Sequence, residues 1–175
     1  MSNYFELYGL PLSFSPDQSL VKKQFYALSK KYHPDFFATK GEAEQEEALL
    51  MSTENTKAYQ TLSDPKKVLP YVLTLSAMLE EGEQYTLPQD FLMEMMEINE
   101  VLMELQFDPN PVLLEKTSDE ITKLEAQMDL ELSTQTQDFD ALDNHHKQVK
   151  LVKIKDLYYR AKYLARLKET LSKMK

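Results

Sequence analysis

Apolar residues recur every three or four positions through most of this chain, and short polar or proline-containing stretches interrupt the pattern. This spacing is that of helices with one buried face. The composition supports it, because glycine is scarce (3 residues) and Leu, Glu, Lys, Gln and Met are abundant. These straight-chain residues lose little rotamer freedom in a helix. The sequence therefore predicts an all-α protein.

Several classes of protein are disfavoured at once. The sequence has no cysteine, which excludes disulfides, thiolate nucleophiles and cysteine metal sites. The opening stretch MSNYFELYGL lacks the basic start and the apolar run of a signal peptide. No run of about 18 apolar residues is present, so we expect no transmembrane helix. We expect a cytoplasmic protein that makes no membrane contact.

Charge is distributed unevenly along the chain. Residues 76–145 contain 2 basic and 18 acidic residues, a net charge of −16, whereas residues 146–175 contain 10 basic and 2 acidic residues, a net charge of +8. Oppositely charged segments of one chain are expected to pack against each other. The alternative is a basic tail that binds nucleic acid. The whole chain has a net charge of −9, which favours internal pairing and no nucleic-acid partner, because phosphate binding needs an uncompensated positive surface.

The first 75 residues contain two long helical patterns that flank a His-Pro-Asp tripeptide. We expect helices from Ser15 to about residue 32, over 42–62 and over 65–75, with a loop over 34–41. Ser15 is expected to cap the first helix, with a proline in its first turn. That helix should end before Pro34, because a residue that precedes proline is disfavoured in the α conformation. Pro70 lies inside the last of these helices and should kink or shorten it.

The helix before the tripeptide has two different faces. Its inward face is expected to carry Val21, Phe25, Leu28 and Tyr32. Its outward face carries Lys22, Lys23, Tyr26 and Lys30. The helix should therefore present a basic surface next to the tripeptide.

A histidine beside a carboxylate suggests a catalytic site, but the sequence argues against one. The proline between His33 and Asp35 fixes the backbone, so the two side chains cannot behave as a free dyad. No serine in a recognisable nucleophile turn is nearby. We predict that the chain is not an enzyme, and that the tripeptide and the basic helix dock on an acidic partner.

Residues 3–75 resemble a J-domain, the module that recruits DnaK-type chaperones and stimulates their ATPase. The resemblance rests on the tripeptide, on the preceding VKKQFYALSKKY and on the later NTKAYQTLSDP. It implies that the chaperone binds His33, Pro34 and Asp35 together with Lys22, Lys23, Tyr26, Lys30 and Lys31. Tyr26 stands where J-domains usually carry a basic residue, and Phe36 where a lysine commonly follows the tripeptide. The charge of the docking face therefore rests on the four lysines.

The second half contains three further helical patterns after a polar linker. We expect these helices at about 88–106, 111–132 and 144–173. The last helix is expected to bury Leu151, Ile154, Tyr158, Ala161 and Leu164. Three amphipathic helices with short connections predict an antiparallel bundle. The predicted division is therefore a J-domain over 1–75, a linker over 76–87 and a three-helix domain over 88–175.

The helix expected at 88–106 has more apolar surface than one buried face requires. Its core stripe is Phe91, Met95, Ile98, Leu102 and Leu105. A second apolar set, Leu92, Met96 and Met103, lies about 100–140° away around the helix. Met93, Glu97, Glu100 and Glu104 lie beside that second set. Either the helix contacts two neighbours, which would bury both sets, or it exposes a Leu/Met patch bordered by carboxylates that binds a partner.

The stretch FLMEMMEINEVLME at 91–104, followed by a small helical bundle, resembles the HscB family, the J-protein co-chaperones of iron–sulfur cluster assembly. The resemblance covers nearly the whole chain. It implies that the J-domain engages an HscA-like chaperone of the DnaK type, and that the C-terminal domain binds an IscU-like scaffold protein. The implied scaffold contacts are Leu92, Met93, Met96, Glu97, Glu100 and Glu104, with Ile154 near the position of an aromatic contact in relatives. Met96 stands where relatives have leucine.

No cofactor or metal is expected. Two alternatives remain open at this point. One is a J-domain co-chaperone that serves a different client. The other is a non-catalytic structural helical bundle in which the His-Pro-Asp tripeptide is coincidental.

Overall fold

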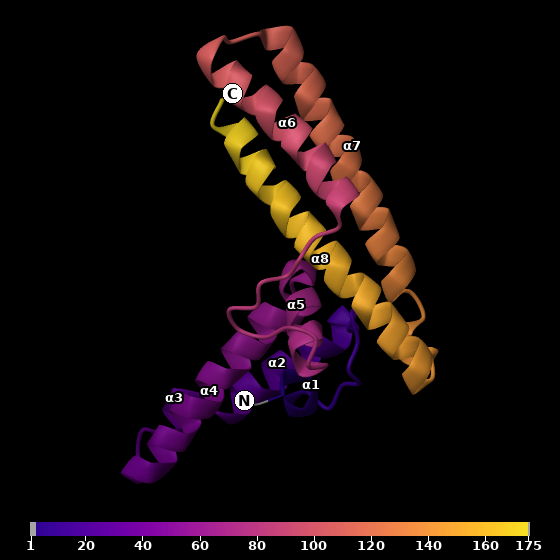
Figure 1. Cartoon of the computed structure of the whole chain (residues 1–175). Coiled ribbons are helices and arrows are strands. Elements are labelled where there is room, and N and C mark those ends of the chain that lie inside the picture. Colours follow the sequence, from indigo (N-terminus) through magenta and orange to yellow (C-terminus); the bar gives the residue numbers. More distant parts are fainter. Residues whose placement is uncertain (1–2, 175) are drawn as a thin grey trace. The chain divides into compact units, whose positions relative to one another are not determined.

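The computed structural model describes residues 3–174, which form two compact units divided between Leu79 and Glu80. Every regular element within the described residues is helical (Figure 1). The all-α prediction is confirmed. No helix among residues 3–174 is long and apolar enough to cross a membrane.

The first unit is a helical hairpin with short helices around it. Its elements are α1 (Tyr4–Leu7), α2 (Gln18–Lys31), α3 (Pro34–Phe37), α4 (Glu42–Leu62) and α5 (Pro65–Leu75). Helices α2 and α4 pack against each other, and α1, α3 and α5 all contact α4. Fully buried aliphatic side chains form the core, among them Val21 from α2, Leu62 from α4 and Val72 from α5. The hairpin thereby holds the turn between α2 and α4 in a fixed position.

A buried polar group sits at the centre of this hairpin. The Tyr8 hydroxyl donates to the Asn55 side-chain oxygen at 2.9 Å and approaches the Asn55 backbone carbonyl oxygen at 3.0 Å. The Asn55 side-chain amide donates in turn to the Phe25 carbonyl oxygen and to the Ser29 hydroxyl. Burial raises the pKa of Tyr8 well above its ordinary value. Because each of these buried polar atoms has a partner, the hydrogen bonds offset the cost of desolvation, and the network links α1, α2 and α4.

Two details of the first unit differ from the prediction. Asp17, rather than Ser15, caps α2, because the Asp17 carboxylate accepts from the backbone N–H groups of Ser19 and Leu20. The predicted loop over 34–41 contains the single turn of α3, since a proline has a backbone conformation suited to the first position of a helix. Helix α5 is not shortened by Pro70 and continues to Leu75.

The second unit is a three-helix bundle (Figure 1). Its elements are α6 (Gln89–Phe107), α7 (Pro111–Thr136), the 3-10 turn η1 (Phe139–Ala141) and α8 (Asn144–Ser172). Its core cluster contains Phe91, Met95, Ile98, Leu102, Ile121, Leu164, Leu167 and Leu171. The predicted core stripe of α6 is confirmed at all five positions, including Leu105.

Helix α8 buries a slightly different stripe from the one predicted. Leu157 is buried where Tyr158 was expected, and Ala161 is exposed. Leu157 and Tyr158 lie three and four residues after Ile154, so both fit a helical period. The helical period allows both stripes, so tertiary packing decides which of these residues is buried.

Residues 80–87, which the sequence predicted to be linker, pack on α8 and belong to the second unit. Lys155 pairs with Glu83, and Glu83 also accepts from the Tyr159 hydroxyl at 3.1 Å. The Tyr85 ring stacks on Tyr159 with a centroid separation of 4.5 Å. A second ion pair joins Lys168 of α8 to Glu125 of α7. These two pairs confirm that the basic C-terminal segment packs against the acidic one.

Candidate functional site

The first candidate surface is the turn between α2 and α4. His33 is the N-cap of α3, and its Nδ1 accepts from the Asp35 backbone N–H at 3.3 Å. The Phe36 ring stands edge-on to the imidazole, with centroids 6.0 Å apart. The side chains of His33 and Asp35 are 52% and 86% exposed. The local sequence thus holds the imidazole in a defined position at the surface.

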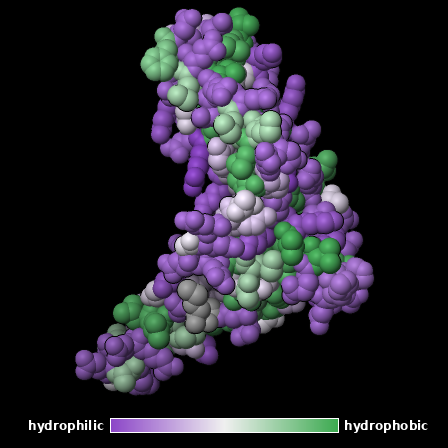
Figure 2. Space-filling model, viewed as in Figure 1, coloured by the Kyte–Doolittle hydropathy of each residue, from purple (hydrophilic) through white to green (hydrophobic). Residues whose placement is uncertain are grey.

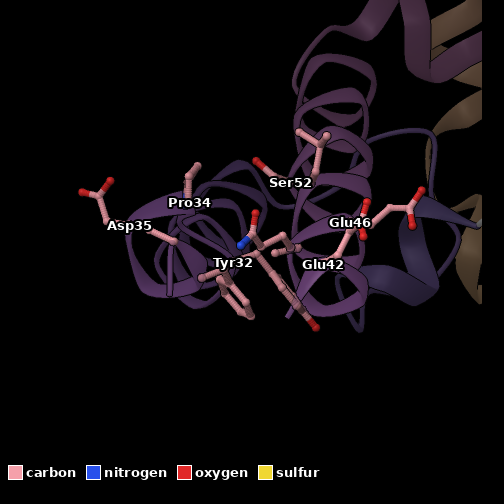
Figure 3. A pocket seen from close by; sticks show the side chains of 11 residues that line it. Tyr32, Pro34, Asp35, Glu42, Glu46 and Ser52 are labelled. Atoms are coloured by element: carbon pink, nitrogen blue, oxygen red, sulfur yellow. The ribbon is translucent and has the colours of Figure 1, made fainter. Parts of the chain in front are cut away.

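The contact between His33 and Asp35 does not have the geometry of a hydrogen-bonded dyad. The Nδ1 atom lies 3.5 Å from an Asp35 carboxylate oxygen, which is longer than a hydrogen bond to a charged group. Because Nδ1 already accepts from the backbone, the ring proton of the neutral imidazole belongs on Nε2. Figure 3 shows the Asp35 carboxylate directed away from α4. The two polar groups of the tripeptide are therefore available to a partner.

The outer face of α2 presents uncompensated positive charge beside this turn. Lys22, Lys23, Lys30 and Lys31 are all exposed, and Tyr26 is 60% exposed among them. No ion pair within residues 3–174 neutralises any of the four lysines. The Lys31 ammonium lies 5.0 Å from the centroid of the Tyr32 ring. The structure brings all the predicted chaperone-binding residues to one turn and the helix that leads into it.

A shallow groove of about 580 Å³ lies between α3 and α4 next to this turn (Figure 3). Tyr32, Phe37 and Leu49 supply apolar wall, and Glu42 and Glu46 lie on the α4 side. Figure 2 shows apolar side chains interrupting the hydrophilic surface over this part of the first unit. The groove was not predicted from the sequence. Helix α4 packs one face against α2, and Leu49 lies off that face, where it is 67% exposed.

The second candidate surface is the outer face of α6. Met93 and Met96 are each 57% exposed and Met103 is 53% exposed. Glu97, Glu100 and Glu104 are exposed beside them. The alternative in which a second neighbour buries this face is therefore wrong for the methionines. A thioether side chain is flexible and polarizable, so these residues can adapt to the shape of a partner.

The remaining predicted scaffold contacts differ from the methionines. Leu92 is half-buried and lines a groove beside α8. Ile154 is fully buried in α8. A side chain with no exposed surface cannot touch a partner without a rearrangement, so Ile154 is not part of the exposed surface. Its burial agrees with the prediction that Ile154 belongs to the core stripe of the last helix.

The groove beside Leu92 was not visible in the sequence. Its other walls come from residues 83–87 and from α8, and the contacts that hold these segments together join residues 71 to 76 positions apart. No local pattern connects such distant segments. Among the described residues no cluster of His, Asp or Glu has the arrangement of a metal site.

Comparisons with known proteins follow the same division of the chain. The DnaJ domain family matches residues 3–71, and the family described as the HSCB C-terminal oligomerisation domain matches residues 87–172. The solved structure of chaperone HscB from Vibrio cholerae is 32% identical, with a TM-score of 0.67, and the match covers 98% of this chain and 96% of that one.

The chain belongs to the HscB family of J-domain co-chaperones. This is a family of co-chaperones and not of enzymes. The co-chaperone HscB homolog of Vibrio cholerae serotype O1 is 46% identical over 101 residues, which are 57% of this chain and 59% of that relative. The homolog of Vibrio parahaemolyticus is 38% identical over 65% of this chain and 68% of its own length. The crystal structure of human HscB, 24% identical with a TM-score of 0.71, covers 98% of this chain and 81% of its own, and supports the fold.

Proposed function

We propose that this HscB-family protein stimulates the ATPase of an HscA-like chaperone of the DnaK type and delivers an IscU-like iron–sulfur scaffold protein to it. The observation that carries the proposal is the presence of two different exposed surfaces on two separate units of one chain. One is the capped tripeptide with its basic helix, and the other is the Met/Glu face of α6. An adaptor requires such a pair of surfaces.

The J-domain surface suits a transient partner with an acidic face. Uncompensated lysines on α2 attract such a face over a distance of about 10 Å and accelerate association. The imidazole of His33 and the carboxylate of Asp35 then offer a donor and an acceptor from a turn whose backbone Pro34 restricts. In this proposal the tripeptide acts on the catalytic cycle of the chaperone and undergoes no chemistry itself.

The α6 surface suits a partner with an apolar patch inside a basic border. Met93 and Met96 provide the apolar contacts, and such anchors commonly carry most of the energy of an interface. The flanking glutamates are solvated, so they contribute mainly to orientation and association rate. Neither surface requires a metal or a cofactor in this protein.

The decisive experiment measures ATP hydrolysis by an HscA-type chaperone with and without this protein. Wild type should stimulate hydrolysis, and His33→Gln should not. Its melting temperature should change little, because the replaced side chain is exposed and caps only the single turn of α3. His145→Gln, at an exposed histidine in the first turn of α8, is the matched control and should stimulate fully. Stimulation by a folded His33→Gln variant would contradict the proposal.

A binding measurement distinguishes an IscU-like scaffold from a different client protein. Apo IscU-like scaffold should bind wild type in calorimetry and should raise the stimulation of the chaperone further. If the chaperone is stimulated but the scaffold does not bind, the J-domain part of the proposal stands and the client is a different protein.

A further inference from the structure

The groove beside Leu92 has a volume of about 510 Å³ and is open to solvent. One wall is the segment 83–87, which precedes α6, and the opposite wall is a run of α8 from Tyr159 to Arg166. Leu92 lines the groove and is also one of the residues of α6 predicted to contact the scaffold. The groove is therefore continuous with the proposed scaffold-binding surface.

The walls of the groove are held in place by contacts among themselves. The rings of Tyr85 and Tyr159 stack with an interplanar angle of 6°, and the Tyr85 hydroxyl donates to Asp156 at 2.8 Å. The Glu83 carboxylate is bound by Lys155 and by the Tyr159 hydroxyl. Because Lys155 offsets its charge, Glu83 does not make the groove acidic. The groove is thus preformed and lined by aromatic surface.

Two cations remain without a carboxylate partner at this groove. Lys162 and Arg166 are exposed, line the groove, and lie four residues apart on α8, so they are on the same face of the helix. Within residues 3–174 no carboxylate forms an ion pair with either side chain. Both can bind an added anionic group without breaking an existing ion pair.

The groove and the exposed face of α6 therefore carry charges of opposite sign, and Leu92 is a residue of α6 that lines the groove. The face carries the exposed carboxylates of Glu97, Glu100 and Glu104, and the groove carries Lys162 and Arg166. A partner that covers both regions must carry basic groups opposite the glutamates and acidic groups opposite the cations. A rotated partner would bring like charges together, which disfavours that orientation.

We propose that this groove is a second subsite for the scaffold protein, and that it binds an acidic segment of the scaffold. A carboxylate of that segment pairs with Lys162 and Arg166, and a neighbouring apolar side chain packs against the tyrosine pair and Leu92. The inference rests on the proposed function and adds to it the orientation of the bound scaffold. Arginine can bind a carboxylate through two hydrogen bonds, which makes Arg166 the more selective of the two cations.

The first test is a charge reversal with apo IscU-like scaffold as the probe. The double variant Lys162→Glu/Arg166→Glu should raise the Kd of the scaffold by about tenfold, since two exposed ion pairs are replaced by repulsion. Lys162→Gln/Arg166→Gln, which keeps long side chains, should raise it by a smaller factor. Lys153→Glu on the exposed surface of the same helix makes half of the double reversal's change in net charge, and serves as a control together with the single variant Arg166→Glu, which makes the same change in the groove. A Kd within twofold of wild type for the double reversal, or equal effects of Lys153→Glu and Arg166→Glu, would overturn the proposal.

The second test locates the contact directly. Because the chain has no cysteine, Gln84→Cys introduces a single labelling site on the groove, and Gln127→Cys introduces one on the exposed surface of α7. An environment-sensitive fluorophore at position 84 should respond when scaffold is added, whereas the same label at position 127 should not. No response at position 84, with scaffold bound, would exclude the groove as a contact.

These outcomes are separable from those of the proposed function. If wild type does not bind scaffold at all, the proposed client is wrong. If wild type binds and Met96→Ala weakens binding, but the charge reversal and the label at position 84 have no effect, the function stands and the second subsite does not exist.

Discussion

Adjacent methionines on α6 offer a direct test of the proposed scaffold-binding face of this helix. Met95 has no exposed surface and lies in the core of the bundle, whereas Met96 is 57% exposed. Changing either residue to alanine alters helix propensity by the same small amount. The two variants therefore differ only in what each side chain contacts.

Met95→Ala should mainly lower stability, whereas Met96→Ala should mainly weaken scaffold binding. Met95→Ala leaves a cavity and should lower the free energy of unfolding by about 2–5 kcal/mol. For a unit of this size, about 3 kcal/mol corresponds to a fall of about 15 °C in the melting temperature. Met96→Ala should change stability by less than about 0.5 kcal/mol. If Met96 anchors the scaffold, its loss should weaken binding by about 2 kcal/mol, or roughly 30-fold in Kd.

Thermal melting followed by circular dichroism measures the first quantity, and titration calorimetry with apo scaffold measures the second. The titrations are made at a temperature at which both variants are folded. Folded Met95→Ala should bind the scaffold with a Kd close to that of wild type. The reasoning would be refuted if Met96→Ala melted as low as Met95→Ala, or if the two folded variants weakened binding equally.

Three further predictions concern charge, pH and the buried network. Association of the protein with the chaperone should slow as ionic strength rises, because exposed lysines on α2 are screened by salt; an on-rate that is flat with salt, measured by stopped flow, would remove this face from the mechanism. The hydrogen bond from Lys155 lowers the pKa of Glu83 below its ordinary value of 4.5. Stability from this pair is therefore present above pH 4.5 and is lost as pH falls through the lowered pKa, so the difference in melting temperature between wild type and Glu83→Gln should shrink in acid; a difference independent of pH would contradict this. Asn55→Leu should lower the free energy of unfolding by about 1–3 kcal/mol, because it removes the side-chain acceptor of the buried Tyr8 hydroxyl. Adding Tyr8→Phe should restore part of this loss. If denaturant unfolding shows that the losses of the two single variants simply add, the hydrogen bond does not couple the two residues.

Patterns confined to one helix were predictable from the sequence. The bounds of α4 agree with the prediction, and all five residues of the α6 core stripe are buried. Both results depend on the fixed period of a helix and on the placement of turn-forming residues. The turn at the tripeptide was also predictable from the sequence, because the effect of Pro34 on the end of α2 and the start of α3 is local.

Choices between equivalent local options needed the structure. Ser15 and Asp17 are both good helix caps, and Asp17 is the cap because α2 begins directly after it, at Gln18. Leu157 and Tyr158 both fit the period of α8, and the structure buries Leu157. Capping chemistry and helical period allow both members of each pair, so local sequence could not separate them.

The two candidate surfaces also have features that the sequence predicts and features that only the structure shows. Sequence alone determined that α6 carries more apolar residues than one buried face needs, and that the α2 face is basic beside the His-Pro-Asp turn. Only the tertiary structure decided that Met93 and Met96 are exposed, that Ile154 is buried, and that Lys162 and Arg166 meet segment 83–87 beside Leu92. The physical reason is that helical periodicity determines which residues share a face, whereas the exposure of that face depends on packing partners that are distant in the sequence.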